Sequence, residues 1–198
     1  MNRRRLIIIG AGGHGRVMED VAGLSGYTDI AFLDDKLPVL GKVKDFVRYV
    51  TASDFFVAIG DNAVRERIFT ELSEHHATIV KLLHPKAVIA DGVTIGAGTA
   101  VMAGAVINPG VRVGDGVIVN TCSSIDHDCT IEAFTHISVG AHLAGTVHTG
   151  RRTFVGMGAN IIHQVTICAD CVIGAGTAVV KDIDERGTYV GVPAKRID

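Results

Sequence analysis

A six-residue repeat constrains the fold of this chain more than any other feature. Stepping by six from Ile89 to Val179 gives sixteen positions, of which fifteen are aliphatic and one is Thr149. The residue two places before each of them is small or β-branched, and side chains two apart share one face of a strand. A helix would need a 3.6-residue period and hairpins would need turns at varied spacings, so neither keeps a strict six.

The repeat predicts a coil with three flat sides per turn, each about six residues long. The aliphatic residue fills the interior, the small residue lies inward near a corner, and successive turns pair as parallel strands about 4.8 Å apart. Corners need unusual backbone angles, and glycines recur there at Gly92, Gly98, Gly104, Gly110 and Gly116. The pattern resembles the hexapeptide-repeat acyltransferases, which implies an all-β left-handed parallel β-helix with a C-terminal cap over residues 85–198.

The composition agrees with a strand-rich core. The chain is 47% hydrophobic but only 5% aromatic, has no Trp and contains 24 Gly, so its core must be packed from Val, Ile, Ala and Thr. A net charge of -2 gives no electrostatic reason to expect nucleic acid or an acidic membrane as a partner. Residues 92–111 carry no charge, but their six-residue glycine spacing indicates periodic soluble structure rather than a membrane span.

The four cysteines are expected to be structural. Cys168 and Cys171 have the spacing of a redox or zinc pair, but no second pair or suitable His completes a ligand set. Cys129 and Cys171 fall at positions where the coil requires a small residue. We therefore predict no metal and a reducing, cytoplasmic environment. The basic start at Arg3 leads into an apolar run too short for a signal peptide.

Residues 1–84 predict a small α/β domain with a Rossmann-like parallel sheet. Buried-type strands are expected at residues 6–9, 30–33, 55–59 and 79–83. Helical stretches are expected at residues 16–24 and 63–75, so strands and helices alternate.

The first strand of this domain leads into a glycine-rich loop. Gly10-Ala11-Gly12-Gly13-His14-Gly15, followed by Asp34 and Asp35, formally matches a dinucleotide-binding fingerprint. The domain has about half the usual size, so we expect one nucleotide rather than NAD. Its phosphate would meet the glycines and the helix start, His14 would donate to it, and Asp34 or Asp35 would accept from base or ribose. A simple turn role for His14 and a dehydrogenase remain alternatives.

The strongest catalytic candidate is His127. It follows the interior residue Ile125 by two places and is therefore expected at a corner, pointing outward. A His beside a carboxylate is the usual general base for an amine or hydroxyl, with Asp128, or less favourably Asp126, orienting the ring. One turn of the coil is eighteen residues, so Gly145 would lie above His127, leaving space and an N–H for a thioester oxyanion. A solvated surface His is the alternative.

Other histidines follow the same geometry. His163 would lie one turn beyond Gly145, and His136, His142 and His148 occupy outward positions on the flat sides. His136 could bind the acyl donor. His142 and His148 are expected to be ordinary outward polar residues, because no carboxylates face them to complete a metal site.

The chain resembles the bacterial nucleotide-4-amino-sugar N-acetyltransferases of the PglD type, relatives of the NeuD-type sialic-acid O-acetyltransferases. The resemblance runs nearly end to end. It is carried by Gly10-Ala11-Gly12-Gly13-His14-Gly15, Phe32-Leu33-Asp34-Asp35, Ala58-Ile59-Gly60-Asp61-Asn62, Asn120-Thr121, Ile125-Asp126-His127-Asp128-Cys129 and Gly191-Val192-Pro193-Ala194-Lys195-Arg196.

The resemblance implies the following site residues. His127 matches the family's catalytic base, and Asp128 matches its partner, where many members have Glu. The positions that line acetyl-CoA are His136, Gly145, Met157 and Ala175. The positions of the nucleotide-sugar pocket are Gly12, Gly13, His14, Asp34, Asp35 and Gly60, with Asn120 near the sugar.

The resemblance also implies an activity. Acetyl would pass directly from acetyl-CoA, as co-substrate, to the amino group of a UDP-linked 4-amino-4,6-dideoxy sugar, without a metal. The family is trimeric, with active sites between adjacent β-helices. The alternatives are an O-acetyltransferase of the sialic-acid type, acting on a sugar hydroxyl, and a β-helix scaffold without catalytic activity.

Overall fold

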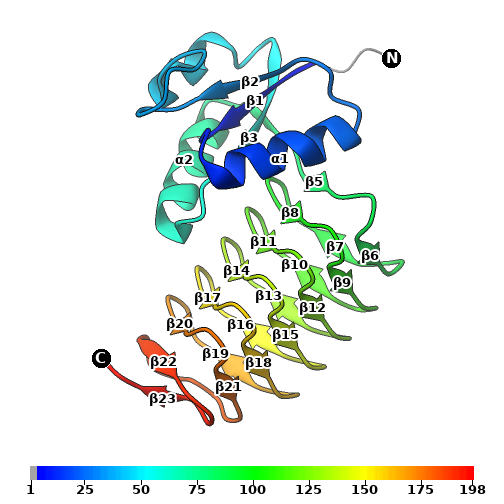
Figure 1. Cartoon of the computed structure of the whole chain (residues 1–198), viewed down its shortest axis with the longest axis vertical. Helices are drawn as coiled ribbons and strands as arrows, with labels where there is room; N and C mark the ends of the chain where they lie inside the picture. The colour runs from blue at the N-terminus through cyan, green and yellow to red at the C-terminus, as the bar shows by residue number, and fades with distance from the viewer. Residues whose placement is uncertain (1–3) are drawn as a thin grey trace.

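The computed structural model describes residues 4–198, so Arg3 lies outside the described residues. A small α/β unit stands at one end of a long β-helix, and the chain passes from one to the other through β5 (Figure 1). Within the described residues, no helix is both long and apolar enough to cross a membrane.

The N-terminal unit is a parallel sheet with helices on both faces, as predicted. Its strands are β1 (Arg5–Ile9), β2 (Ile30–Leu33), β3 (Ser53–Val57) and β4 (Thr78–Ile79), in the order β2-β1-β3-β4. Alternate residues of β1 face opposite sides. Leu6 and Ile8 pack with α1 (Gly13–Leu24), and Ile7 and Ile9 pack with α2 (Asn62–Glu74). Both faces of the sheet are therefore buried.

Several boundaries differ from those predicted. Helix α1 begins at Gly13 rather than at residue 16, because the glycine-rich loop itself forms the first turn. The predicted strand at 79–83 is two strands, since the chain leaves the first sheet at β4 and enters the β-helix at β5 (Leu82–Leu83), which pairs with β8. The short helix η1 (Val43–Arg48) carries no strong apolar period and was not predicted.

The β-helix consists of two-residue strands, each ending on a residue of the predicted series. The strands are β6 (Val88–Ile89), β7 (Thr94–Ile95), β8 (Ala100–Val101), β9 (Val106–Ile107), β10 (Arg112–Val113), β11 (Ile118–Val119), β12 (Ser124–Ile125), β13 (Thr130–Ile131), β14 (His136–Ile137), β15 (His142–Leu143), β16 (His148–Thr149), β17 (Phe154–Val155), β18 (Asn160–Ile161), β19 (Thr166–Ile167), β20 (Val172–Ile173) and β21 (Ala178–Val179). The predicted β-helix is confirmed.

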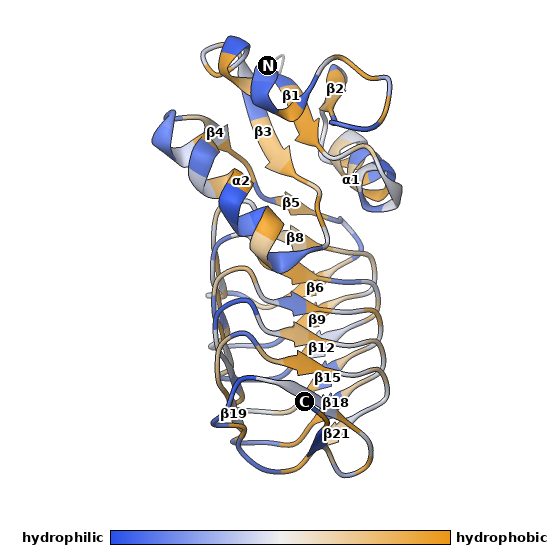
Figure 2. Ribbon diagram, turned by 90° about the vertical axis from the view of Figure 1, so that its left-hand side faces the viewer, coloured by the Kyte–Doolittle hydropathy of each residue, from blue (hydrophilic) through white to orange (hydrophobic). Residues whose placement is uncertain are grey.

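Three parallel sheets form the sides of this prism. The five-stranded sheet runs from β7 to β19, the six-stranded sheet from β6 to β21, and the eight-stranded sheet contains β5, β8, β11, β14, β17 and β20. The aliphatic residues fill one continuous core, which Figure 2 shows as apolar strands stacked along the prism. The predicted corner glycines have φ between +60° and +80°, where other residues pay a steric cost of roughly 1–2 kcal/mol.

A hairpin closes the far end of the prism. Strands β22 (Thr188–Val190) and β23 (Lys195–Arg196) pair antiparallel, and β22 extends the eight-stranded sheet from β20. This hairpin stands where the sequence predicts a C-terminal cap.

The N-terminal unit is fixed along one corner of the prism, between the five-stranded and eight-stranded sheets. Phe69 of α2 packs edge-on against Phe134, with ring centroids 5.3 Å apart. Glu66 of α2 bonds to Arg151 and Arg152, the latter at 2.7 Å. The nucleotide-type domain therefore lies beside the eight-stranded face.

Candidate active site

One pocket brings together the residues predicted to hold the nucleotide. It has a volume of about 460 Å³ and opens between the glycine-rich loop, the end of β2 and the loop that follows β3. Its lining includes all six predicted residues: Gly12, Gly13, His14, Asp34, Asp35 and Gly60.

The glycine-rich loop leaves the start of α1 open. A Cβ at Gly15 would lie 2.0 Å from the Gly10 carbonyl oxygen, so the loop can close only with glycine there. A Cβ at Gly12 or Gly13 would meet nothing within 4 Å, and no side chain caps the helix. The first N–H groups of α1 therefore face open space, an arrangement that suits a phosphate.

The two acidic residues after β2 have different roles in the structure. Asp34 Oδ2 accepts from the Ala11 N–H at 2.9 Å, and its Oδ1 accepts from the Lys36 and Leu37 N–H groups at 2.7 and 3.0 Å. These bonds, led by that of Ala11, lower the pKa of Asp34. Asp35 is exposed and uses Oδ1 to accept from Val43. Asp34 thus anchors the glycine loop, and Asp35 stands at the rim.

Two neutral histidines connect this pocket to the β-helix. Burial, followed by the nearby charge of Arg65, lowers the pKa of His14 to about 4. Burial, followed by the nearby charges of Arg65 and His14, lowers the pKa of His136, on β14, to about 3. Asn120 Nδ2 lies 3.1 Å from His136 Nε2 while Asn120 Oδ1 accepts from the Thr121 N–H. The Asn120 amide therefore donates to the ring, and the two residues continue from the nucleotide pocket toward the next corner.

Arg65 is a buried residue that sequence analysis missed. Its guanidinium, 1% exposed, donates to the backbone carbonyls of Ile59, Gly60, Gly116 and Phe134 and to Asn62 Oδ1, at 2.7–3.1 Å. It joins the loop that borders the pocket to two turns of the prism. The available signal was its spacing: Arg65, Ile68 and Leu72 share the buried face of α2.

The predicted catalytic pair lies on the corner between the six-stranded and five-stranded sheets. His127 Nδ1 is 2.9 Å from Asp128 Oδ2, and the two side chains are 58% and 66% exposed. The hydrogen bond that Nδ1–H donates to the Asp128 carboxylate raises the pKa of His127. Asp126 instead accepts from the His127 N–H at 2.8 Å and from Asn108 Nδ2 at 2.7 Å. Asp128 therefore orients the ring, and Asp126 shapes the turn.

Neighbouring glycines make room for this pair. Asp128 has φ +60°, a left-handed conformation that Asp tolerates better than most residues. A Cβ on Gly110, one turn below, would lie 2.4 Å from Asp128 Oδ1, and one on Gly145, one turn above, would lie 2.5 Å from His127 Nε2. Gly145 is thus placed over His127 Nε2, as the eighteen-residue turn predicts.

We expect Asp128→Asn to lower the pKa of His127, because the largest cause of its elevation is lost. Asn tolerates the same left-handed backbone, so the corner is retained. NMR titration of the His127 ring protons measures the change. A His127 pKa identical in the two proteins would contradict the assignment of Asp128 as the charge partner.

Three of the four residues predicted to line acetyl-CoA lie at the two edges of the six-stranded sheet, whereas the fourth, His136, lies apart from them on β14 of the eight-stranded sheet. Gly145 stands at the His127 corner. Met157, 60% exposed, and Ala175 stand one turn apart at the other edge, where Gly176 N–H donates to the Met157 carbonyl at 2.8 Å. Between the edges, a hollow of about 440 Å³ is lined by Asp126, His142, Asn160 and His163, among others.

Within one chain, the His127 corner and the nucleotide pocket lie on opposite sides of the prism. The His127 corner joins the five-stranded and six-stranded sheets, so in a three-sided prism it lies opposite the eight-stranded sheet. His136 and the nucleotide pocket lie on that opposite side, and the apolar core separates them from His127.

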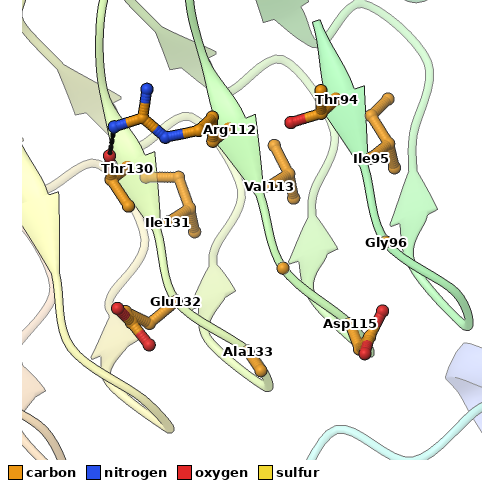
Figure 3. Close-up of a pocket in the computed structure, with 11 residues that line it drawn as sticks. Thr94, Ile95, Gly96, Arg112, Val113, Asp115, Thr130, Ile131, Glu132 and Ala133 are labelled. Carbon is orange, nitrogen blue, oxygen red and sulfur yellow. Dashed lines mark hydrogen bonds between the residues drawn. The ribbon is translucent and has the colours of Figure 1, made fainter.

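A further hollow, of about 470 Å³, lies on the five-stranded sheet (Figure 3). Arg112 donates there to Thr130 Oγ1 at 2.8 Å, and the carboxylates of Asp115 and Glu132 stand nearby. It contains none of the predicted site residues. Over residues 4–198, no group of three or more His, Cys, Asp or Glu side chains is arranged to hold a metal ion.

Comparison with known proteins supports the predicted resemblance. The family described as the PglD N-terminal domain matches residues 5–72. UDP-N-acetylbacillosamine N-acetyltransferase of Bacillus subtilis is 34% identical over 112 residues, which make up 50% of this chain and 52% of that protein. The chain thus spans about half the length of this curated relative.

Two solved structures match almost the whole chain. The acetyltransferase domain of PglB from Neisseria gonorrhoeae, also solved with acetyl coenzyme A, is 38% identical with a TM-score of 0.95, covering 98% of this chain and 100% of that one. PerB from Caulobacter crescentus, solved with CoA and GDP-perosamine, is 38% identical with a TM-score of 0.94, covering 98% of this chain and 97% of that one.

Proposed function

Because the chain belongs to the family of PglD-like nucleotide-sugar N-acetyltransferases, we propose that it transfers acetyl from acetyl-CoA to the amino group of a UDP-linked 4-amino-4,6-dideoxy sugar. The observation that carries this proposal is the corner at His127. There Asp128 orients an exposed imidazole, and the absence of a Cβ at Gly145 lets that ring lie against the next turn of the prism.

His127 acts as the general base in this proposal. The sugar amine attacks the thioester carbonyl carbon, His127 Nε2 takes the amine proton, and the carbon–sulfur bond breaks to release CoA. The Gly145 N–H would stabilise the oxyanion. The contact with Asp128 holds the proton of the resting imidazole on Nδ1, which leaves Nε2 as the acceptor.

The acceptor is held by the N-terminal domain. The diphosphate would bind at Gly12, Gly13 and His14, with the base and ribose toward Asp35 and Gly60. The sugar would extend past His136 to Asn120. The Asn120 amide is already turned toward the His136 imidazole. The neutral state of His14 and His136 suits hydrogen bonding to substrate without fixed charge.

A second copy of the chain completes the site. His127 lies on the side of the prism opposite its own nucleotide pocket, so a sugar bound in one copy would meet His127 of a neighbour. Acetyl-CoA would lie between the copies, along Gly145, Met157 and Ala175. A homotrimer provides three such equivalent clefts.

An acceptor panel tests the reaction. Purified protein with acetyl-CoA should release thiol with UDP-linked 4-amino sugars but not with their 4-hydroxy counterparts, and mass spectrometry should locate acetyl on nitrogen. Acetylation of the hydroxy sugars alone would replace the proposal by the O-acetyltransferase alternative. Reaction only with GDP-linked amino sugars would keep the chemistry and overturn the UDP assignment.

A further inference from the structure

Two cysteines that play no part in the proposed reaction are in contact. The Sγ atoms of Cys168 and Cys171 lie 3.3 Å apart at the corner after β19. Cys171 is fully buried, whereas Cys168 is partly exposed. The spacing recognised in the sequence thus corresponds to a real pair of adjacent thiols.

The fold itself does not require sulfur at either place. At the position of Cys171, three of the four earlier turns carry threonine, at Thr99, Thr135 and Thr153, and the fourth carries Val117. Each threonine hydroxyl donates at 2.8–3.2 Å to the carbonyl fifteen residues ahead. Cys171 makes only long contacts to carbonyl oxygens, at 3.7 and 3.9 Å. At the position of Cys168, three of the four earlier turns carry glycine, at Gly96, Gly114 and Gly150, and the fourth carries Glu132. The pair therefore departs from the repeat at both positions.

We propose that Cys168 and Cys171 form a vicinal dithiol that a peroxide oxidises to an intrachain disulfide. The Cys168 thiolate attacks one peroxide oxygen, the O–O bond breaks, and a sulfenic acid and water form after proton uptake. The Cys171 sulfur then displaces the sulfenic hydroxyl as a second water. Two thiols and one hydrogen peroxide thus give one disulfide and two waters.

The exposure of the two sulfur atoms and the pKa of Cys171 set the order of these steps. Cys168 is the sulfur that a peroxide reaches, because Cys171 is covered by the core. Burial, with the adjacent Cys168, raises the pKa of Cys171 to about 12. Cys171 therefore remains a thiol until the neighbouring sulfur has been oxidised.

The disulfide would close a turn that anchors the N-terminal domain. Asp170 lies between the cysteines with φ +60°. Its carboxylate accepts from Arg152 at 2.6 and 2.7 Å, and Arg152 in turn donates to Glu66 of α2 at 2.7 Å. Oxidation would thus occur beside the contact between the two domains.

Intact-mass and peptide analysis after hydrogen peroxide treatment tests the proposal, in a Cys122→Ser background that removes the exposed thiol. We expect a loss of two hydrogens, a cross-linked peptide containing Cys168 and Cys171, and full reversal by dithiothreitol. Adding Cys168→Ser or Cys171→Ser should abolish the cross-link. Phenylarsine oxide, a dithiol reagent, should bind the reduced background protein with one equivalent and neither double variant.

Three results would contradict the proposed disulfide. Oxygen addition at Cys168 without a cross-link, or a cross-link between chains, would exclude the proposed disulfide. Retention of both free thiols under peroxide that oxidises Cys122 in the wild-type protein would exclude a reactive pair. The proposal is independent of the acetyl-transfer assignment, because neither readout measures activity.

Discussion

His127→Ala is expected to lower kcat by roughly 10²–10⁴-fold, the usual scale for loss of a general base. The proton acceptor is lost, while the corner backbone and the buried core beneath it are unchanged, because the side chain is 58% exposed. The rate of CoA thiol release at saturating acetyl-CoA and amino sugar measures the effect. The Tm and the oligomeric state should match those of the wild type.

His84→Ala is the matched control for this variant. His84 lies just after β5 and contacts the Lys86 N–H through Nδ1 at 3.0 Å, outside both halves of the proposed site. It should therefore retain wild-type kcat. Near-normal turnover of His127→Ala would contradict the assignment of the base.

Arg65→Met is expected to destabilise the chain by about 3 kcal/mol, because buried carbonyl groups lose a charged donor. The guanidinium is 1% exposed and makes bonds to both domains. For a protein of this size, the change corresponds to a drop in Tm of about 6–12 °C. Differential scanning calorimetry at matched protein concentration measures it.

Arg67→Met provides the comparison on the same helix. Arg67 is exposed, and within residues 4–198 its ion pair is with Glu71 on its own helix, at 3.1 Å. Its loss should therefore change stability by less than about 0.5 kcal/mol. Equal Tm values for the two variants would show that Arg65 does not join the domains as the structure indicates.

The β-helix could be predicted from sequence because its period is local. Each turn repeats the same interior environment. The series from Ile89 to Val179 therefore indicates which residues point inward, where each strand ends and where each corner falls, without knowledge of distant residues. The N-terminal domain was predicted less accurately. The boundary near Leu82 was missed because the repeat is incomplete there: Leu83 lies one six-residue step before Ile89, but Lys81, two places before it, is neither small nor β-branched.

The candidate site was predictable where it depends on the same eighteen-residue turn. The relation between His127 and Gly145, and the clustering of the six nucleotide-pocket residues, both appear in the structure. The contacts of Arg65 depend on how the two domains dock, because its guanidinium donates to Gly60 in one domain and to Gly116 and Phe134 in the other. No local pattern in α2 indicates those partners, so sequence reasoning missed them.

Mixed oligomers of two inactive variants test whether the base of one chain serves the nucleotide pocket of another. Gly13→Asp places a negative charge in open space at the phosphate position of α1, so it should block the acceptor without disturbing the fold. Gly13→Asp and His127→Ala should each be inactive alone. After equal mixing by co-expression, we expect about a quarter of wild-type kcat to be recovered, because random assembly pairs an intact pocket with an intact base at that frequency. No recovery in verified mixed oligomers would contradict a site shared between chains.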